Sequence, residues 1–157
     1  MNISDYIIDQ DGFDWQSSLT DYQCLAGMAF TIWIANLFGD LVLINDSGGI
    51  VYFDSSAGSC RQLCDRKEAF ISWIDVGNNA DDVFMIHLAD ACKSARLKLG
   101  KLQCYSFKKP TILGGEFRPD NVYVCDLTVH YGFMGQLCNQ IANLPDGTKI
   151  TVKFQDA

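Results

Sequence analysis

The sequence predicts an α+β domain with an antiparallel or mixed β-sheet and three to four helices packed mainly on one face. Three observations indicate this class. The chain has 157 residues, of which 48% are hydrophobic, and this length suits one core. Short runs rich in Ile, Val, Phe, Trp and Tyr suit a pleated surface. The predicted elements follow the order strands, helices, strand, helix, strand, which is typical of α+β folds.

The N-terminal part predicts one short helix and three strands. The first 25 residues are polar and rich in aspartate, and a short helix is expected around residues 14–20. Strands are expected at 29–35, 40–45 and 50–53 because β-branched and aromatic residues dominate there. The sequence Asp-Ser-Gly-Gly at 46–49 supplies turn residues, so the second and third strands should form a hairpin.

The middle of the chain predicts two helices. Residues 66–74 form the first, with Phe70, Ile71 and Ile74 toward the core, and the Gly-Asn-Asn sequence at 77–79 ends it. A longer helix is expected at 81–99, with acids at its start and bases in its second half. Both ends would complement the helix dipole, and Gly100 would close the helix as a C-terminal cap.

The last third predicts a strand, a helix and a final strand. Apolar residues alternate with other residues over 122–131 and again over 148–154, which indicates strands with one buried face. Between them, Phe133, Leu137 and Ile141 recur every four residues and indicate a helix face. The Pro-Asp-Gly sequence at 145–147 would stop this helix.

Charge is distributed unevenly along the chain. Net charge is −7, yet residues 1–60 hold eight aspartates and no Lys, Arg or Glu. Residues 61–157 hold the remaining 11 acids and all 12 bases. A field of one sign repels nucleic acids and anionic membranes and speeds encounter with a cationic partner. Acidity also promotes solubility, so charge alone leaves both interpretations open.

Several features favour a cytoplasmic protein with free thiols. There is no apolar run of about 18 residues that could span a membrane. The N-terminus lacks the basic head and apolar run of a signal peptide. Cysteines are seven in number, and their spacing fits no small disulfide scaffold: Cys24, Cys60, Cys64, Cys92, Cys104, Cys125 and Cys138.

Candidate catalytic groups are few and weak. His87 and Asp90 are three residues apart on a predicted helix and could ligate a metal or act as a base. Glu116, Asp120 and Asp126 could surround a nuclease metal, but the lysine or histidine that such sites usually add is missing nearby. No nucleophile elbow, phosphate loop or Cys-x-x-Cys pair occurs. We therefore expect no catalytic residue, no metal and no cofactor.

From residue 103 onward the sequence carries a set of motifs. They read QCYSF at 103–107, KPTILGGEF at 109–117, DNVYV at 120–124, VH at 129–130, GQL at 135–137 and LPDGT at 144–148. Together they resemble the C-terminal domain of immunity proteins of type VI secretion DNase toxins, which often follows a GAD-like region. The earlier sequences NLFGD at 36–40 and GGIVYFD at 48–54 resemble the Phe-Gly turn and hairpin of the same family.

These motif residues have structural explanations. Gly114 and Gly115 suit a turn that needs positive φ or close backbone approach, and Asn121 suits a turn before a strand. The resemblance implies a single immunity-type domain over 1–157. Its parts would be an acidic segment at 1–28, strands and two helices at 29–99, and the family-matching part at 100–157.

The resemblance implies an immunity protein that binds a cognate toxin effector and occludes its active site or substrate groove. The toxin would be a cationic nuclease, and no nucleic acid or membrane would be bound. Aspartates of the N-terminal third could stand in for phosphates in such a groove, with an aromatic anchor. The expected partner-binding residues are Asp9, Asp11, Asp14, Trp15, Asp21, Asp46 and Asp54. The alternatives are a small metal-dependent hydrolase and an interaction module unrelated to toxins.

Overall fold

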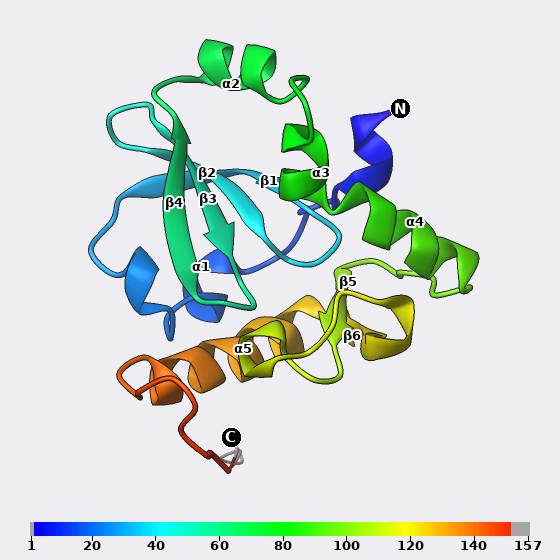
Figure 1. Ribbon diagram of the computed structural model, residues 1–157. Helices are drawn as coiled ribbons and strands as arrows, with labels where there is room; N and C mark the ends of the chain where they lie inside the picture. Colours follow the sequence, from blue (N-terminus) through cyan, green and yellow to red (C-terminus); the bar gives the residue numbers. More distant parts are fainter. Residues whose placement is uncertain (1, 152–157) are drawn as a thin grey trace.

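The computed structural model describes residues 2–151 and confirms the α+β class (Figure 1). Over those residues the chain forms a four-stranded and a two-stranded sheet, both antiparallel. In chain order the elements are η1 (Ile3–Tyr6), α1 (Trp15–Ser18), η2 (Gln23–Leu25), β1 (Phe30–Ala35), β2 (Leu41–Asn45), β3 (Ile50–Asp54), β4 (Ser59–Cys64), α2 (Lys67–Trp73), α3 (Asn79–Phe84), α4 (Ile86–Ser94), β5 (Gln103–Phe107), η3 (Thr111–Leu113), η4 (Pro119–Asn121), β6 (Val122–Asp126) and α5 (Leu127–Ile141).

The larger sheet is a meander in the order β1-β2-β3-β4. The three expected N-terminal strands are confirmed, and so is the hairpin between β2 and β3. Its turn is held by the Asn45 side chain, whose Oδ1 accepts hydrogen bonds from the amides of Ser47 and Gly49. Strand β4 is not among the predicted strands, because exposed polar residues such as Arg61 and Gln62 interrupt its apolar pattern.

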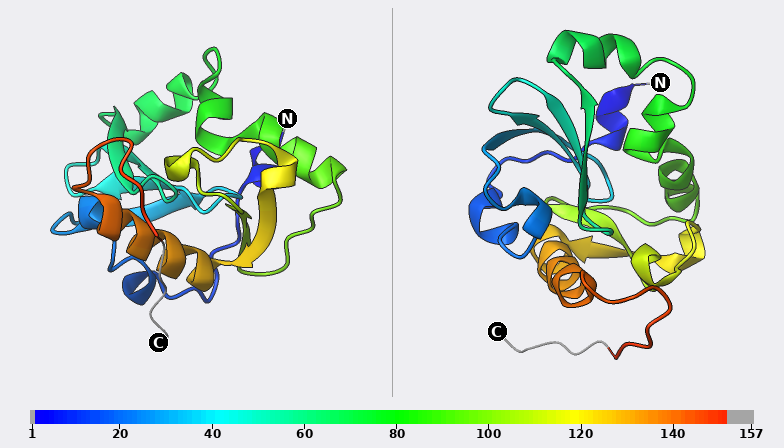
Figure 2. Two further views of the ribbon diagram at one scale, coloured as in Figure 1. Left: turned by 60° about the horizontal axis from the view of Figure 1, so that its bottom comes forward. Right: turned by 60° about the vertical axis from the view of Figure 1, so that its left-hand side comes forward.

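Both faces of this sheet are buried. Leu41, Leu43 and Phe53 point into the larger core cluster, which also contains residues of α4, β5, β6 and α5. On the other face, Val42 and Tyr52 pack with residues of α2 and α3. Figure 2 shows α2 and α5 on opposite sides of the sheet. The helices therefore cover both faces rather than mainly one, and this explains why β2 and β3 are apolar without alternation.

The second sheet pairs β5 with β6, with Cys104 opposite Cys125. Its strand β6 ends at Asp126, so the predicted strand over 122–131 is wrong beyond that residue. Helix α5 begins at Leu127, and Leu127, Tyr131 and Met134 are buried with helical spacing. The apolar residues of 127–131 fit both periods, and the requirement to bury Tyr131 together with Met134 selects the helix. The helical face with Leu137 is confirmed.

The predicted helix at 81–99 is broken into α3 and α4. Met85 has φ +48°, which breaks the helix and changes the chain direction between α3 and α4. The break lets Phe84 join one core cluster while Ala89 and Cys92 join the other. Helix α4 ends at Ser94, so Gly100 is not its cap. Instead Arg96 takes the left-handed conformation at φ +65°, and the Leu97 amide donates to the Cys92 carbonyl, as in a Schellman ending.

Three smaller expectations have mixed outcomes. The short N-terminal helix is confirmed as α1. Phe70 on α2 and Ile74, the residue that follows the helix, are buried as expected, but Ile71 is exposed. Residues 148–151 are not in a strand, and the rest of the expected strand, 152–154, lies outside the described residues. Among residues 2–151, no helix is both long and apolar enough to cross a membrane.

Asn36 holds the turn between β1 and β2. This side chain is buried, and its Oδ1 accepts hydrogen bonds from the amides of Phe38 and Asp40 at 2.9 and 3.0 Å. Its Nδ2 donates to the Val83 carbonyl at 2.8 Å, which ties the turn to α3. The turn also needs Gly39, whose φ is +82°. One side chain therefore positions both the turn and the neighbouring helix.

We expect Asn36→Ala to destabilise the fold by about 3 kcal/mol, because two buried amides lose their acceptor. Urea unfolding followed by circular dichroism would measure this. Asn143→Ala is the matched control, since Asn143 is exposed in the turn after α5 and should change stability by no more than about 0.5 kcal/mol. Equal effects of the two substitutions would contradict the role given to Asn36.

Candidate partner-binding surface

The largest hollow on the described part of the chain lies between the β3–β4 turn, helices α3 and α4, and the loop between β5 and β6. Its volume is about 700 Å³. Figure 2 shows this loop beside α4, and η4 contacts that helix. The cavity is lined by Asp40, Tyr52, Asp54, Ser56, Ser59, Arg61, Asp81, Asp82, Met85, His87, Leu88, Ala91, Phe107, Thr111, Phe117 and Pro119.

The polar side chains of the cavity are mainly acidic. Four aspartates line it, against one arginine and one histidine. The guanidinium of Arg61 lies over the ring of Tyr52, 5.5 Å from its centroid. His87 lies against Asp81, with Nδ1 2.7 Å from Oδ1, while Asp82 is exposed. Asp82 thus presents its carboxylate to solvent at the rim.

Phe117 forms an apolar part of the same rim. Its side chain is 63% exposed, although it belongs to the large aromatic residues that are usually buried. Its ring packs edge-on against the buried Phe107, with 5.5 Å between the centroids. The Phe107 contact orients Phe117 while leaving most of its surface free. An oriented, exposed aromatic beside carboxylates is a suitable anchor for a protein partner.

Behind the cavity, a chain of buried polar groups crosses the core. Asp40, at the floor of the cavity, accepts hydrogen bonds from the Tyr52 hydroxyl at 2.7 Å and from the Ser55 amide at 2.8 Å. The Ser55 hydroxyl is 2.9 Å from Asp40 and 2.8 Å from Nε2 of His130. Nδ1 of His130 is 2.9 Å from the Ser106 hydroxyl. These contacts connect β2 and β3 to β5 and α5.

When Asp40 is ionised, one placement of the hydrogen atoms gives every group in this hydrogen-bond network a partner. Ser106 donates to Nδ1 of His130, Nε2–H donates to Ser55, and Ser55 donates to the Asp40 carboxylate. The imidazole is then neutral, and burial lowers the pKa of His130 to about 4. Burial, with the nearby charge of Asp54, raises the pKa of Asp40 to about 7, while the hydrogen bonds from Tyr52 and Ser55 oppose that shift.

This buried chain is a structural network rather than a catalytic one. Ser55 is fully buried and His130 is 1% exposed, so neither can touch a substrate. Ser55 also lies between the carboxylate and the imidazole, whereas in a catalytic triad the histidine lies between the other two groups. His130 falls within the predicted strand over 122–131, but in the structure it is buried on α5.

The network joins two of the sequence motifs. Gly39, in the Phe-Gly turn, packs so closely on the His130 ring that an added Cβ would lie 3.0 Å from it. The next residue on α5, Tyr131, donates a hydrogen bond to the Gly39 carbonyl at 2.7 Å. The motif at 36–40 and the motif at 129–130 therefore meet in space, and each needs the other for its hydrogen bonds.

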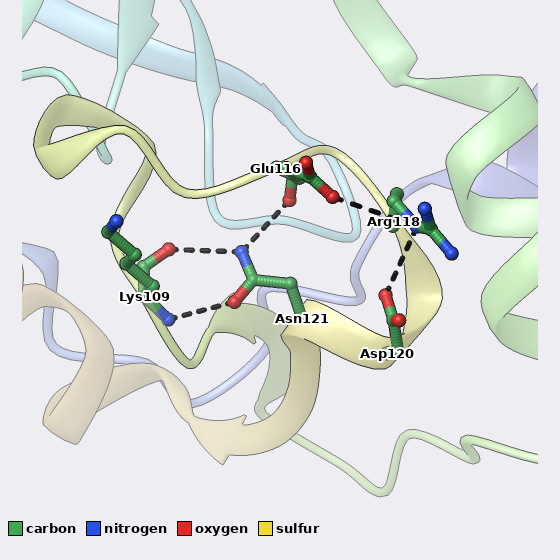
Figure 3. Close-up of polar contacts among 5 residues, drawn as sticks. All are labelled: Lys109, Glu116, Arg118, Asp120 and Asn121. Carbon is green, nitrogen blue, oxygen red and sulfur yellow. Dashed lines mark hydrogen bonds and ion pairs between the residues drawn. The ribbon is translucent and has the colours of Figure 1, made fainter.

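The loop before β6 is built around Asn121 (Figure 3). Its Oδ1 accepts a hydrogen bond from the Lys109 amide, and its Nδ2 donates to the carbonyls of Lys109 and Glu116. Gly114 has φ +87°, and a Cβ on Gly115 would overlap the Lys109 carbonyl oxygen. The expectations of a positive φ and a close approach at this glycine pair are confirmed. The loop holds Phe117 at the cavity rim.

The structure does not support the two candidate metal sites. Glu116 and Asp120 both lie near the exposed Arg118 guanidinium, at 3.8 and 3.4 Å, as Figure 3 shows, whereas Asp126 accepts from Gln103. Asp90 accepts a hydrogen bond from Tyr6. His87 pairs instead with Asp81. Within residues 2–151, no group of three His, Cys, Asp or Glu side chains is placed to hold a metal.

The expected partner-binding residues fall into separate groups. Asp9, Asp11 and Asp14 are exposed near α1, where Asp14 also caps the helix by accepting from Ser17. Asp46 is exposed in the β2–β3 turn, and Asp54 ends β3. About 13 Å of strand separates Ile50 from Asp54, so the two aspartates lie at opposite ends of β3.

Three of these residues also have structural contacts. Trp15 is half-buried, and its ring centroid lies 5.7 Å from that of Tyr131. Asp54 is half-buried, accepts from the amides of Ser56 and Ala57, and has its pKa raised by burial. Asp21 is half-buried beside α5, where an added Cβ on Gly135 would lie 3.0 Å from its own Cβ. Asp54 is the one member of the expected set that lines the largest cavity of the described residues.

Sequence reasoning missed Asp82 and Phe117 as surface candidates. Asp82 follows Asp81 at the start of a helix, and this pair is typical of helix capping. A usable signal existed for Phe117, because a large aromatic within the polar sequence Gly-Glu-Phe-Arg-Pro has few apolar neighbours along the chain. The fold was needed to bring both residues to one cavity.

The depressed pKa of His130 gives a pH dependence with a definite sign. Unfolded histidine binds a proton below about pH 6.5, whereas buried His130 does so only near pH 4. Its contribution to stability is therefore present at neutral pH and is lost as pH falls from about 6.5 to about 4.

We expect the stability difference between the wild type and His130→Gln to shrink by about 3 kcal/mol between pH 7 and pH 4. Urea unfolding of both proteins at several pH values would measure it. Asp40, whose pKa is raised, changes stability in the opposite direction over this pH range. Both proteins contain Asp40, so its contribution cancels in the difference when Gln preserves the surroundings of Asp40. A difference that stays constant with pH would show that His130 is not buried in its neutral form.

We expect Asn121→Ala to loosen the loop before β6 and to cost about 1–2 kcal/mol, because three hydrogen bonds to backbone groups are lost. Amide exchange at Lys109, followed by NMR, should become faster. Asp120→Ala is the adjacent control, since it removes only an exposed ion pair. Loosening by both substitutions alike would argue against the role of Asn121.

Comparison with known proteins gives one informative match. Residues 65–138 match the family model described as the C-terminal part of the T6SS immunity protein Tdi1. The matched segment begins just after β4 and ends in the last turn of α5, so it contains α3, α4 and the loop that carries Phe117. A search of the curated proteins finds no match to this chain.

Proposed function

We propose that this chain, which belongs through residues 65–138 to the type VI secretion immunity protein family, binds and neutralises a cognate toxin that is a nuclease. The family match is the observation that carries the proposal. Immunity proteins act by binding their toxin, so a protein-binding surface is required and a catalytic site is not. The chain of polar groups around His130 is closed to solvent and serves the interior, which fits a non-catalytic role.

Charge supports a nuclease as the toxin. A nuclease groove is cationic because it grips phosphates, and an acidic protein surface can occupy it in their place. The rim of the largest cavity in the described part of the chain offers Asp54 and Asp82, with Phe117 as an exposed aromatic. Asp81 is already in contact with His87 and therefore adds less. This surface has the composition expected of an inhibitor that covers a cationic groove.

The acidic N-terminal segment (residues 1–28), together with Asp46 in the β2–β3 turn, would add a second part of the binding surface. Asp9, Asp11 and Asp46 are exposed, and none of them belongs to an ion pair within residues 2–151. Asp14 and Asp21 would contribute charge, and Trp15 the apolar edge left free by its packing on Tyr131. We propose that these residues steer the toxin by long-range attraction, while the cavity rim makes the close contacts.

The N-terminal segment and the family-matching part would act as one unit in the cytoplasm. Tyr22 packs edge-on against Phe53 and Tyr131, which joins the segment to both the large sheet and α5. The Tyr22 hydroxyl donates to the Ser55 carbonyl at 2.9 Å. Because these contacts are buried, we expect toxin binding to involve a preformed surface rather than folding on contact.

We expect Asp82→Lys and Phe117→Ala each to weaken toxin binding by about tenfold or more in low salt, since one reverses a rim charge and the other removes an anchor. The binding partner would be the secreted toxin encoded by the neighbouring gene, measured by calorimetry at two salt concentrations. Asp75→Lys is the charge-matched control, on the exposed linker between α2 and α3. An equal loss of affinity in this control would show that Asp82 acts only through the net charge of the protein and not through a specific contact.

A second pair of variants tests two aspartates at the ends of β3, Asp46 and Asp54. Asp46→Lys reverses an exposed charge, whereas Asp54→Asn removes a charge but keeps the acceptor that Ser56 and Ala57 need. We expect weaker binding at low salt, because both changes reduce attraction to a cationic groove. Unchanged affinity at low salt in both variants would remove these two residues from the interface. Failure of the wild-type chain to protect cells that express the toxin would overturn the immunity function itself.

A further inference from the structure

Two cysteines far apart in the sequence meet beneath the N-terminal segment. Cys24 lies on η2 and Cys60 on β4, and their sulfur atoms are 2.6 Å apart. A disulfide bond is about 2.05 Å long, so bonding requires only a small further approach. Both residues are free thiols and half-buried, which leaves them within reach of small molecules. Local sequence offers no reason to connect them, because 35 residues separate the two positions.

The fold holds this pair in place from both sides. Cys60 is opposite Phe53 in the β3–β4 ladder, and Phe53 is fully buried in the larger core cluster. On the other side, Cys24 lies between the buried residues Tyr22 and Leu25, and η2 contacts β4. Tyr22 is anchored through its hydroxyl to the Ser55 carbonyl. The two sulfurs are therefore neighbours because of core packing and not because of a flexible loop.

We propose that Cys24 and Cys60 form a reversible intramolecular disulfide when the protein meets a small-molecule disulfide such as oxidised glutathione. The Cys24 thiolate attacks one sulfur of that disulfide, forming a mixed disulfide and releasing one small thiolate. The Cys60 thiolate then attacks Cys24 Sγ and releases the second small thiolate. The protein loses two electrons, the small disulfide gains them, and the two cysteine protons pass to the two released thiols.

Electrostatics favours Cys24 as the first nucleophile. Cys60 donates a hydrogen bond to Cys24, which lowers the pKa of Cys24 and stabilises its thiolate. The same contact raises the pKa of Cys60 while both thiols are reduced, and two adjacent thiolates would also repel each other. Once Cys24 has formed a mixed disulfide, that repulsion is removed and Cys60 can ionise and attack. The order of attack therefore follows from the direction of the hydrogen bond between the two thiols.

The remaining cysteines are less suitable. Cys92, Cys104 and Cys125 are buried, and burial raises the pKa of each thiol. Cys64 is on the same strand as Cys60 but packs toward the other core cluster. Cys138 is the nearest competitor, since it packs on Gly58 close to β4, but it is 8% exposed and burial raises its pKa to about 11. Oxidation should therefore be specific to Cys24 and Cys60.

The bond would fasten the acidic N-terminal segment to the edge strand of the large sheet. Strand β4 is the last strand of its sheet, and η2 precedes β1 in the chain. Closing the loop between residues 24 and 60 restricts the unfolded chain, and the native state needs little rearrangement to accept it. The oxidised protein should therefore keep its structure and unfold at a higher temperature.

The test is to incubate the full chain with oxidised glutathione and measure intact mass, reactive thiols and Tm. We expect the mass to fall by two hydrogens, five thiols to remain of the seven, and Tm to rise by about 5–10 °C. Reduction with excess thiol should reverse all three changes. Digestion without reduction should yield one linked pair of peptides, containing Cys24 and Cys60.

Variants separate the proposed pair from its competitors. Cys24→Ser and Cys60→Ser should abolish the mass loss and the rise in Tm, whereas the control Cys64→Ser on the same strand should retain both. Thiol mapping of the wild type by differential alkylation serves as the second measurement if a variant fails to fold. A linked peptide containing Cys138, disulfides only between molecules, or no oxidation of the wild type would each overturn the proposal.

Discussion

The buried hydrogen-bond chain from Asp40 through Ser55 and His130 to Ser106 connects the halves of this protein. Asp40 and Ser55 belong to the large sheet and its turns, whereas Ser106 and His130 belong to β5 and α5. A buried polar group without a partner costs about 1–3 kcal/mol, so each half stabilises the polar groups of the other. The packing of Gly39 on the His130 ring and the cavity above Asp40 both depend on this arrangement.

The same interaction changes how the acidity of the chain is understood. Of the eight aspartates in the first 60 residues, Asp40 is buried and Asp54 is half-buried, and both have raised pKa values because of burial. Those two carboxylates accept hydrogen bonds from neighbouring groups of the fold, so the negative electrostatic field at the surface is weaker than the composition suggests. The exposed aspartates among residues 1–60 are Asp5, Asp9, Asp11, Asp14 and Asp46, and Asp82 adds an exposed carboxylate at the rim of the cavity. Asp82 and Phe117 on that rim both lie within residues 65–138, the part of this chain that matches the family model.

The interior and the surface therefore have different roles. Asn36, Asn121 and the glycine pair at 114–115 hold turns, and their side chains or conformations are satisfied by neighbouring backbone. Such residues define the fold without contacting a partner. The cysteine pair at 24 and 60 is a third kind of feature, because its chemistry depends on core packing but is reached from solvent. It lies on η2 and β4, and neither of its residues lines the cavity proposed for the toxin.

Local sequence was enough to establish the α+β class, strands β1 to β3 with their hairpin, helix α2 and the conformations of Gly114 and Gly115. These features follow from side-chain periodicity and turn chemistry, which act over a few neighbouring residues. The break at Met85, the helix from Leu127 and the contact between Cys24 and Cys60 emerged only from the folded chain. In the first two cases, local patterns fit more than one conformation, and burial against distant residues selected one. Proximity of Cys24 to Cys60 leaves no trace in local sequence, because packing between distant segments of the core creates it.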